Sequence, residues 1–164
     1  MPPFILYPNP LLHEPAQLRP VDAPMIEAGR QLRDAAAEVA AYGLAAAHLG
    51  MLEPLIVVSV APDRSSRDYR VLFNPRIVTQ SGDRMMDAEG SVSMPGIEVP
   101  IERSVAIELG YDDADNNTHT QTFDGFTARV IQHELDQMNG IFFLNRLSRL
   151  KRDTAIRKYV KSRR

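Results

Sequence analysis

The residues best suited to chemistry lie together in one segment, Gln132-His133-Glu134-Leu135-Asp136-Gln137. At about 100° per residue, His133 and Gln137 fall on one face of a helix, one turn apart. Where a second His stands at the position of Gln137, such a helix holds a metal ion through two imidazoles, and the Glu moves protons on a metal-bound water. The sequence therefore predicts a metalloenzyme helix in which an amide replaces one imidazole ligand.

The chain that must position this helix has 164 residues, of which 44% are hydrophobic and 24% are charged. These values are typical of one globular core, so we expect a single domain over residues 1–164. No stretch reaches the roughly 20 apolar residues of a membrane span, and the Pro-rich start lacks a leader-peptide pattern. We therefore expect a cytoplasmic protein with no membrane contact. Cysteine is absent, which excludes disulfides, thiolate metal ligands and cysteine nucleophiles.

Charge is distributed unevenly along the chain. Nine Lys and Arg residues lie between Arg146 and Arg164 against one acid, Asp153, so this tail carries +8 while the whole chain carries −2. We predict a basic C-terminal helix at residues 148–164. Its charge suits a contact with nucleic acid, and the plainer interpretation is a solvated helix face.

Periodicity and capping residues predict three helices. A buried helix is expected over residues 25–42, ending at Gly43, and the motif helix can begin at a cap on Asp124 or Thr127. A final helix is expected over residues 148–161. Its apolar contacts should come from Leu150, Ile156, Tyr159 and Val160.

Runs of β-branched residues and alternation of apolar with polar residues predict the strands. They are expected at residues 54–60, 69–73, 76–80, 104–111 and 118–123. The last two form a hairpin, and segment 89–100 is expected to be a loop. The pair Met85-Met86 implies no site and is expected to be filler in the core or on the surface.

Three separated segments, taken together, resemble the peptide deformylase family. They are Gly43-Leu44-Ala45-Ala46-Ala47-His48, Glu89-Gly90-Ser91-Val92-Ser93 and the segment from Gln132 to Gln137, in the family's order. The resemblance implies an α+β fold with mixed or antiparallel strands around the central motif helix, and helices near both ends. It also implies removal of the formyl group from the initiator Met of new proteins, with a nascent chain or N-terminal peptide as partner and ribosome docking through the last helix.

The departures from the family lie in the metal ligands. The family uses a Cys thiolate and two imidazoles, and this chain has Ser91, His133 and Gln137 at those positions. A serine hydroxyl is a poor ligand for the metals that thiolates select, and an amide oxygen suits harder ions. We therefore expect no bound metal, or Fe, Zn or Ni held weakly.

The resemblance assigns chemical roles to two further side chains. Glu134 stands at the general acid/base position, where proton transfer depends on a metal that lowers the pKa of water toward about 7. His48 stands where the family has a Gln that hydrogen-bonds the developing oxyanion, and an imidazole can also donate there. Whether the chain is an enzyme is left open, and we expect hydrolysis to be lost or reduced.

The peptide cradle, in contrast, matches the family. The resemblance implies that the backbone of Gly43, Gly90 and Val92 hydrogen-bonds an extended peptide. It also implies an ion pair between Glu89 and Arg103 that supports the second motif. The leading hypothesis is therefore a deformylase-like protein with a degenerate metal site that binds a nascent chain or an N-terminal peptide.

Other interpretations stay open. An active deformylase or amidase would use an unusual site made of His48, His133, Glu89 and water, and a regulatory ribosome partner would act through the tail alone. Ser91 beside an imidazole is a candidate nucleophile. In the plainest interpretation, His133 is a buried histidine satisfied by hydrogen bonds, and Glu134 is a structural carboxylate.

Overall fold

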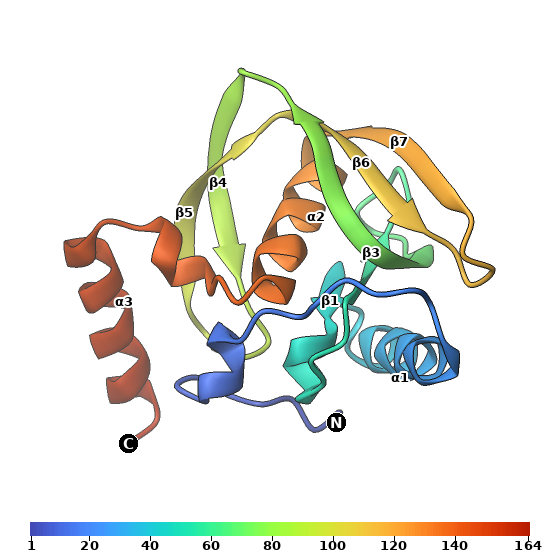
Figure 1. The fold of residues 1–164 in the computed structure, drawn as a ribbon. Coiled ribbons are helices and arrows are strands. Elements are labelled where there is room, and N and C mark those ends of the chain that lie inside the picture. The colour runs from blue at the N-terminus through green and yellow to red at the C-terminus, as the bar shows by residue number, and fades with distance from the viewer.

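An antiparallel sheet of five strands forms the larger layer of the fold (Figure 1). The computed structural model describes residues 1–164. In spatial order the five strands are β1 (Gly43–Ala45), β2 (Leu55–Ser59), β3 (Tyr69–Gln80), β6 (Ala106–Asp112) and β7 (Thr118–Asp124). A second, two-stranded antiparallel sheet pairs β4 (Arg84–Gly90) with β5 (Glu98–Ser104). Strands and helices are thus combined in the α+β manner that the resemblance implied.

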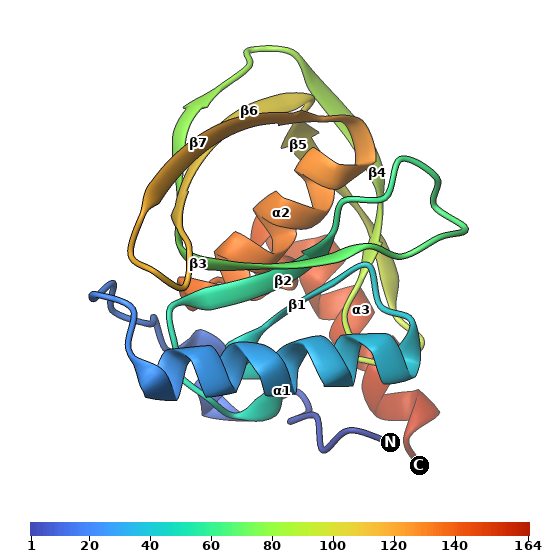
Figure 2. The ribbon, with the colours of Figure 1, turned by 90° about the vertical axis from the view of Figure 1, so that its right-hand side faces the viewer.

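The motif helix α2 (Gly125–Met138) lies at the centre of these sheets. Figure 2 shows β3, β6 and β7 curving around it. The helix follows β7 directly, because Gly125 has φ 59° and turns the chain from strand to helix at a value that few side chains tolerate. Asp124 occupies the predicted cap position, but its side chain makes no capping hydrogen bond. The apolar face of α2, including Ile131 and Leu135, joins the core beneath β6.

The first helix, α1 (Ala23–Val39), covers the other face of β2 and β3 (Figure 2). Asp22 caps it by accepting a hydrogen bond from the Met25 backbone N–H at 3.0 Å. The predicted end at Gly43 is wrong. Ala40 takes the left-handed conformation at φ 52°, which ends the helix at Val39 and leaves residues 41–42 to lead into β1.

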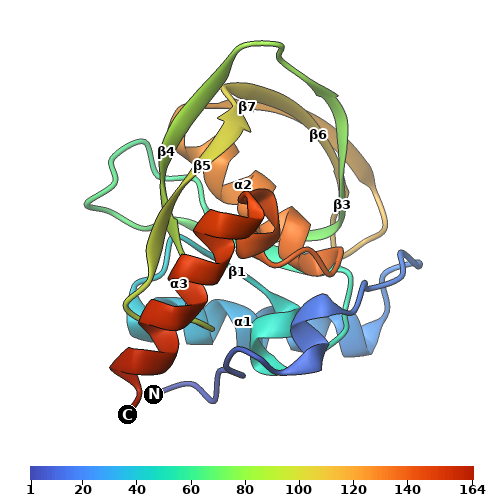
Figure 3. The same cartoon turned by 90° about the vertical axis from the view of Figure 1, so that its left-hand side faces the viewer.

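The last helix, α3 (Arg149–Ser162), packs beside β5 and the N-terminal segment (Figure 3). Ser148 caps it by accepting a hydrogen bond from the Lys151 N–H at 3.3 Å. Tyr159 is buried as predicted, but Leu150 is 73% exposed and Val160 is 47% exposed. Their predicted core contacts are wrong, because the helix buries a narrow stripe that runs through Ala155 and Tyr159.

Two strand predictions also need correction. Segments 69–73 and 76–80 form one strand, because Asn74 takes φ 47° and a bulge between Phe73 and Arg76 carries the chain past Pro75. The predicted strand 104–111 is divided at Val105, between β5 and β6.

Sequence reasoning missed the β4–β5 sheet almost entirely. The predicted loop 89–100 is shorter, since β4 runs to Gly90 and β5 starts at Glu98. The side chains of Met85 and Met86 on β4 are 51% and 56% exposed.

Two short 3-10 helices, η1 (Pro10–His13) and η2 (Ala46–Leu49), meet near the start of the chain, and a third, η3 (Phe143–Arg146), precedes α3. None of the helices combines the length and apolar character that crossing a membrane requires.

Candidate functional site

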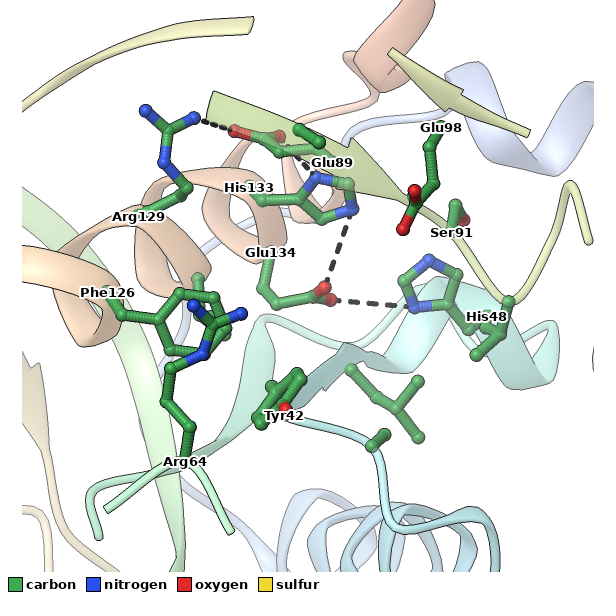
Figure 4. A pocket seen from close by; sticks show the side chains of 17 residues that line it. Tyr42, His48, Arg64, Glu89, Ser91, Glu98, Phe126, Arg129, His133 and Glu134 are labelled. Carbon is green, nitrogen blue, oxygen red and sulfur yellow. Dashed lines mark hydrogen bonds and ion pairs between the residues drawn. The ribbon is translucent and has the colours of Figure 1, made fainter. Parts of the chain in front are cut away.

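A pocket of about 370 Å³ lies between β1, the end of β4 and the first turns of α2 (Figure 4). It brings together all of the predicted site residues except Gln137 and Arg103. Gly43 is needed at this point because a Cβ there would lie 2.7 Å from the Val130 side chain and 3.0 Å from the Glu134 side chain, so the backbone of β1 packs directly against side chains of α2. The lining residues are Ala41, Tyr42, Gly43, Leu44, His48, Arg64, Ala88, Glu89, Gly90, Ser91, Val92, Glu98, Phe126, Arg129, Val130, His133 and Glu134.

His133 is held in one orientation by Glu89. Its Nδ1 donates to Glu89 Oε1 at 2.7 Å, which directs Nε2 toward Glu134 Oε1 at 3.6 Å. Burial would lower the pKa of His133, but the hydrogen bond to Glu89 and the charges of Glu134 and Glu89 hold it above its ordinary value. His133 therefore presents a single ring nitrogen to the pocket.

His48 has the opposite hydrogen-bond role at Nδ1, which accepts a hydrogen bond instead of donating one. The Ala45 backbone N–H donates to its Nδ1 at 3.0 Å, so in the neutral ring the proton resides on Nε2. Burial and the neighbouring His133 lower the pKa of His48 to about 3, which keeps the ring neutral. Its Nε2 is buried and has no hydrogen-bond partner. His48 is thus a fixed donor at the closed end of the pocket.

Glu134 lies between the two imidazoles (Figure 4). Its Oε2 is 3.6 Å from His48 Nδ1, but that nitrogen already accepts a hydrogen bond from Ala45, and Oε2 is buried without a partner. The residue is 4% exposed, and burial raises the pKa of Glu134 to about 7, against the opposing charge of His133. Such a carboxyl can hold or release a proton near neutral pH.

The far side of His133 is supported by a network of ion pairs. Arg103 donates to both oxygens of Glu89, at 2.9 and 2.8 Å, and to Asp136 at 2.6 Å. Arg129 donates to Glu89 at 2.7 Å and to the backbone carbonyls of Ile101 and Met85. The expected Glu89–Arg103 pair is therefore present as part of a larger cluster.

Sequence reasoning missed Arg129, although a signal existed. Arg129 stands one helical turn before His133, so the same periodicity that singled out the motif places its side chain on the face of α2 that supports the site. Tyr42, Arg64, Glu98 and Phe126 were also missed. Their contribution depends on which loops meet at the pocket, which the sequence pattern does not encode.

The other two residues that the resemblance placed at ligand positions, Gln137 and Ser91, make hydrogen bonds of their own. Gln137 Nε2 donates to the Leu12 backbone carbonyl at 2.7 Å, and Gln137 does not line the pocket. Ser91 Oγ accepts from the Ser93 N–H at 3.1 Å and makes no hydrogen bond to either imidazole. Iron and zinc favour thiolate and imidazole ligands, and one imidazole, a hydroxyl and a tethered amide are a poor match to that preference.

Two of the alternative sites find no support in these contacts. In the proposed set of His48, His133 and Glu89, both Glu89 oxygens are bonded to arginine, and one is also bonded to His133. For Ser91 as a nucleophile, the hydroxyl makes no hydrogen bond to His48 or His133, and His48 Nε2 carries a proton, so that nitrogen cannot accept the hydroxyl proton as a base would.

Both the sequence and the fold are similar to those of known proteins. The model of the family described as Polypeptide deformylase matches residues 1–153. A "Peptide deformylase-like" protein of Rhizobium meliloti (strain 1021) is 37% identical over 160 residues, 97% of this chain and 91% of the relative. A "Peptide deformylase" of Agrobacterium fabrum is 32% identical over 163 residues, 99% of this chain and 96% of the relative.

Solved structures agree with the sequence comparison. The crystal structure of peptide deformylase from Ehrlichia chaffeensis superposes with a TM-score of 0.89 at 28% identity, covering 98% of this chain and 95% of that one. A peptide deformylase from Legionella pneumophila gives a TM-score of 0.87 at 28% identity, covering 98% and 94%. The chain belongs to the peptide deformylase family.

Proposed function

We propose that this protein binds the N-terminal part of a peptide in the pocket and that its metal-dependent deformylation is lost or strongly reduced. The observation that carries the proposal is the commitment of Gln137 to the Leu12 carbonyl, which leaves His133 as the one retained family ligand. Loss of a partner that merely orients a metal ligand costs about 10- to 100-fold in affinity or activity, and two ligands themselves are changed here.

The edge of the sheet supports peptide binding. β1 is the outermost strand of its sheet and pairs on one side only, with β2. Gly43 and Leu44 of β1 line the pocket, opposite Gly90 and Val92. An extended peptide can hydrogen-bond to such a free edge through its main chain, and this binding does not depend on the side chains that hold a metal.

The closed end of the pocket supports recognition of a peptide start. His48 Nε2 is a donor without an acceptor, and Glu134 Oε2 is an acceptor without a donor. Buried polar groups nearly always have partners, so a buried donor and a buried acceptor that are both unpaired indicate a place for a ligand. The formamide of a formylated N-terminus offers both a carbonyl and an N–H, and a free amine offers donors alone.

The test begins with the protein as isolated and after anaerobic addition of Fe(II), Ni(II) or Zn(II). We expect turnover of a formyl-Met peptide to remain more than about tenfold below that of an ordinary family member. Calorimetric titration should show binding of formyl-Met or Met peptides without added metal, and His48→Phe should weaken it. Turnover within tenfold of an ordinary deformylase would contradict the proposal.

A matched variant checks the role of the ligand positions. Ser91→Cys combined with Gln137→His restores the family's donor set, and we expect it to bind one transition-metal ion per chain where the parent protein does not. Metal analysis after gel filtration gives the readout. Equal metal content in the parent and the double variant would show that the replaced side chains do not determine metal binding.

A second role, docking at the ribosome, has one observation in its favour. The Lys and Arg side chains of α3 are mostly exposed, and the helix has a single ion pair of its own, Arg149 with Asp153 at 3.9 Å. Binding through phosphate contacts should fall steeply with salt. Co-sedimentation of the full chain with ribosomes should weaken when Lys151 and Lys158 are changed to Glu, and an unchanged pellet would rule this role out.

A further inference from the structure

Two arginines of one loop, Arg64 and Arg67, stack on Tyr42, which lines the pocket, and they make different contacts. The loop joins β2 to β3. Arg67 Nε donates to the Ala40 carbonyl at 3.0 Å, and its NH1 donates to the carbonyls of Arg64 and Ser66 at 2.7 and 2.9 Å. Its guanidinium also stacks 4.0 Å from the ring centre of Tyr42. Arg67 thus holds the loop in place with most of its donors used.

The guanidinium of Arg64 stacks on aromatic rings. Its guanidinium carbon lies 3.7 Å from the ring centre of Phe126 and 5.6 Å from that of Tyr42, and the two rings pack edge to face at 4.7 Å (Figure 4). No hydrogen bond or ion pair engages its side chain, although it lines the pocket. Stacking uses the flat face of a guanidinium and leaves its N–H edges free for a carboxylate.

The other charged groups of the pocket single out Arg64. Arg129, the other arginine that lines the pocket, donates hydrogen bonds to Glu89 and to the backbone carbonyls of Ile101 and Met85. Glu98 lines the pocket without an ion-pair partner, and Figure 4 shows it near Ser91, away from Phe126 and Arg64. A negative group on a ligand is therefore repelled at the Glu98 end and attracted at the Arg64 end.

We propose that Arg64 is a specificity residue that binds a carboxylate of the peptide in the pocket, so that acidic peptides are preferred. This inference rests on the proposed peptide binding. The carboxylate has two possible sources, an Asp or Glu side chain near the start of the peptide or the terminal carboxylate of a short peptide. Both would meet the N–H edges of Arg64 in the plane of its guanidinium.

The experiment measures dissociation constants with Met peptides of five residues by calorimetry. C-terminally amidated peptides carry Glu or Gln at position 2, 3 or 4, and a further peptide pair compares a free with an amidated C-terminus. We expect at least one carboxylate to improve binding about tenfold, the effect of one charge-assisted hydrogen-bonded pair. The position of the effective carboxylate identifies its source.

Three variants decide whether Arg64 causes the preference. Arg64→Met keeps a side chain on the aromatic rings, and it should abolish the preference while binding of the Gln peptides stays within about twofold. Arg64→Lys should retain part of it, since a point charge remains without the planar pair of donors. Arg33→Met removes an exposed charge outside the pocket lining and should leave the preference intact.

The possible results distinguish the role of Arg64 from peptide binding itself. Binding of peptides with no carboxylate preference at any position, or a preference that survives in Arg64→Met, overturns the role of Arg64 and leaves peptide binding standing. Absence of binding for every peptide, with or without a carboxylate, overturns both. Loss of the preference in Arg64→Met but not in Arg33→Met supports the assignment.

Discussion

Two clusters of buried polar residues flank His133, and they differ in how completely they are paired. On one side, the carboxylates of Glu89 and Asp136 receive hydrogen bonds from three arginines, Arg103, Arg129 and Arg146. On the other side, His48 and Glu134 each keep a buried polar atom without a partner. The paired cluster fixes the shape of the site, and the unpaired one retains the capacity to bind a ligand.

Glu89 and Glu134 show that hydrogen-bond partners, and not burial alone, determine whether a buried carboxyl group is charged. Burial acts to raise the pKa of both Glu89 and Glu134. Hydrogen bonds from Arg103 and His133 outweigh it for Glu89 and lower that pKa to about 2, whereas the pKa of Glu134 rises to about 7. Glu89 is a permanent anion, and Glu134 is a group whose proton is exchanged in the neutral range.

The largest effect is expected from breaking the paired cluster. Arg103→Met removes the donor shared by Glu89 and Asp136 and leaves buried charge uncompensated, which typically costs about 3 to 5 kcal/mol. Urea unfolding followed by circular dichroism measures the loss. Arg84→Met, at an exposed arginine of β4, is the matched control and should change the free energy of unfolding by less than about 0.5 kcal/mol. Equal effects of the two variants would show that the cluster contributes no special stability.

The same cluster predicts that the stability of the protein depends on pH in the acidic range. Because the pKa of Glu89 is about 2 when folded and 4.5 is its ordinary value, its contribution to stability is fully present above pH 4.5. It is lost as the pH falls from 4.5 toward 2. Glu89→Gln should therefore be less stable than the parent at pH 7, and the gap should narrow below pH 4.5. A gap that stays constant down to pH 2.5 would show that Glu89 does not carry this linkage.

An intermediate effect is expected at Gln137. Gln137→Ala leaves the buried Leu12 carbonyl without its donor, at a cost of about 1 to 3 kcal/mol. Gln31→Ala, at an exposed amide of α1, is the control and should cost little. Hydrogen exchange should increase in η1, where the tether ends, and unchanged exchange there would indicate that this contact does not hold the N-terminal segment.

Gln137 also shows where sequence reasoning reaches its limit. Helical periodicity placed Gln137 and His133 on one face of α2, and the resemblance supplied their family roles. The partner of Gln137, however, is the carbonyl of Leu12, which is 125 residues away and which no local pattern connects to it. The expected Glu89–Arg103 pair is present, yet Arg129, to which the sequence analysis gave no role, also donates to Glu89.

The sequence predicted the elements that have a clear local apolar pattern and missed those that depend on distant contacts. The buried strand at residues 54–60 and the helix α2 have apolar patterns that match their environment, and both exist. Strand β4, with the sequence Arg84-Met85-Met86-Asp87-Ala88-Glu89-Gly90, has little β-branched content and is mostly exposed, so its pairing with β5 had no local signal. The left-handed Ala40 ended α1 early because backbone geometry at the β1 junction overrode helix propensity.

An effect of opposite sign is expected in the unpaired cluster, and it appears only where Glu134 is ionised. The pKa of Glu134 rises from 4.5 to about 7 on folding, so ionised Glu134 destabilises the fold, and stability falls as the pH rises between these values. Glu134→Gln cannot ionise. It should match the parent below pH 4.5 and be more stable by about 3 kcal/mol at pH 8, the linkage equivalent of that pKa shift, in contrast to Glu89→Gln.

Thermal unfolding of Glu134→Gln and the parent at pH 4.5 and pH 8 decides whether the unpaired cluster exists in solution. If the variant gains stability at pH 8 and loses peptide binding, Glu134 contributes to ligand binding and lowers the free energy of unfolding. If it is instead less stable than the parent at pH 8, Glu134 has a partner that satisfies its charge. The polar groups of both clusters would then be paired. His48 and Glu134 would have a structural role, like the arginine network on the other side of His133, and no role in binding a ligand.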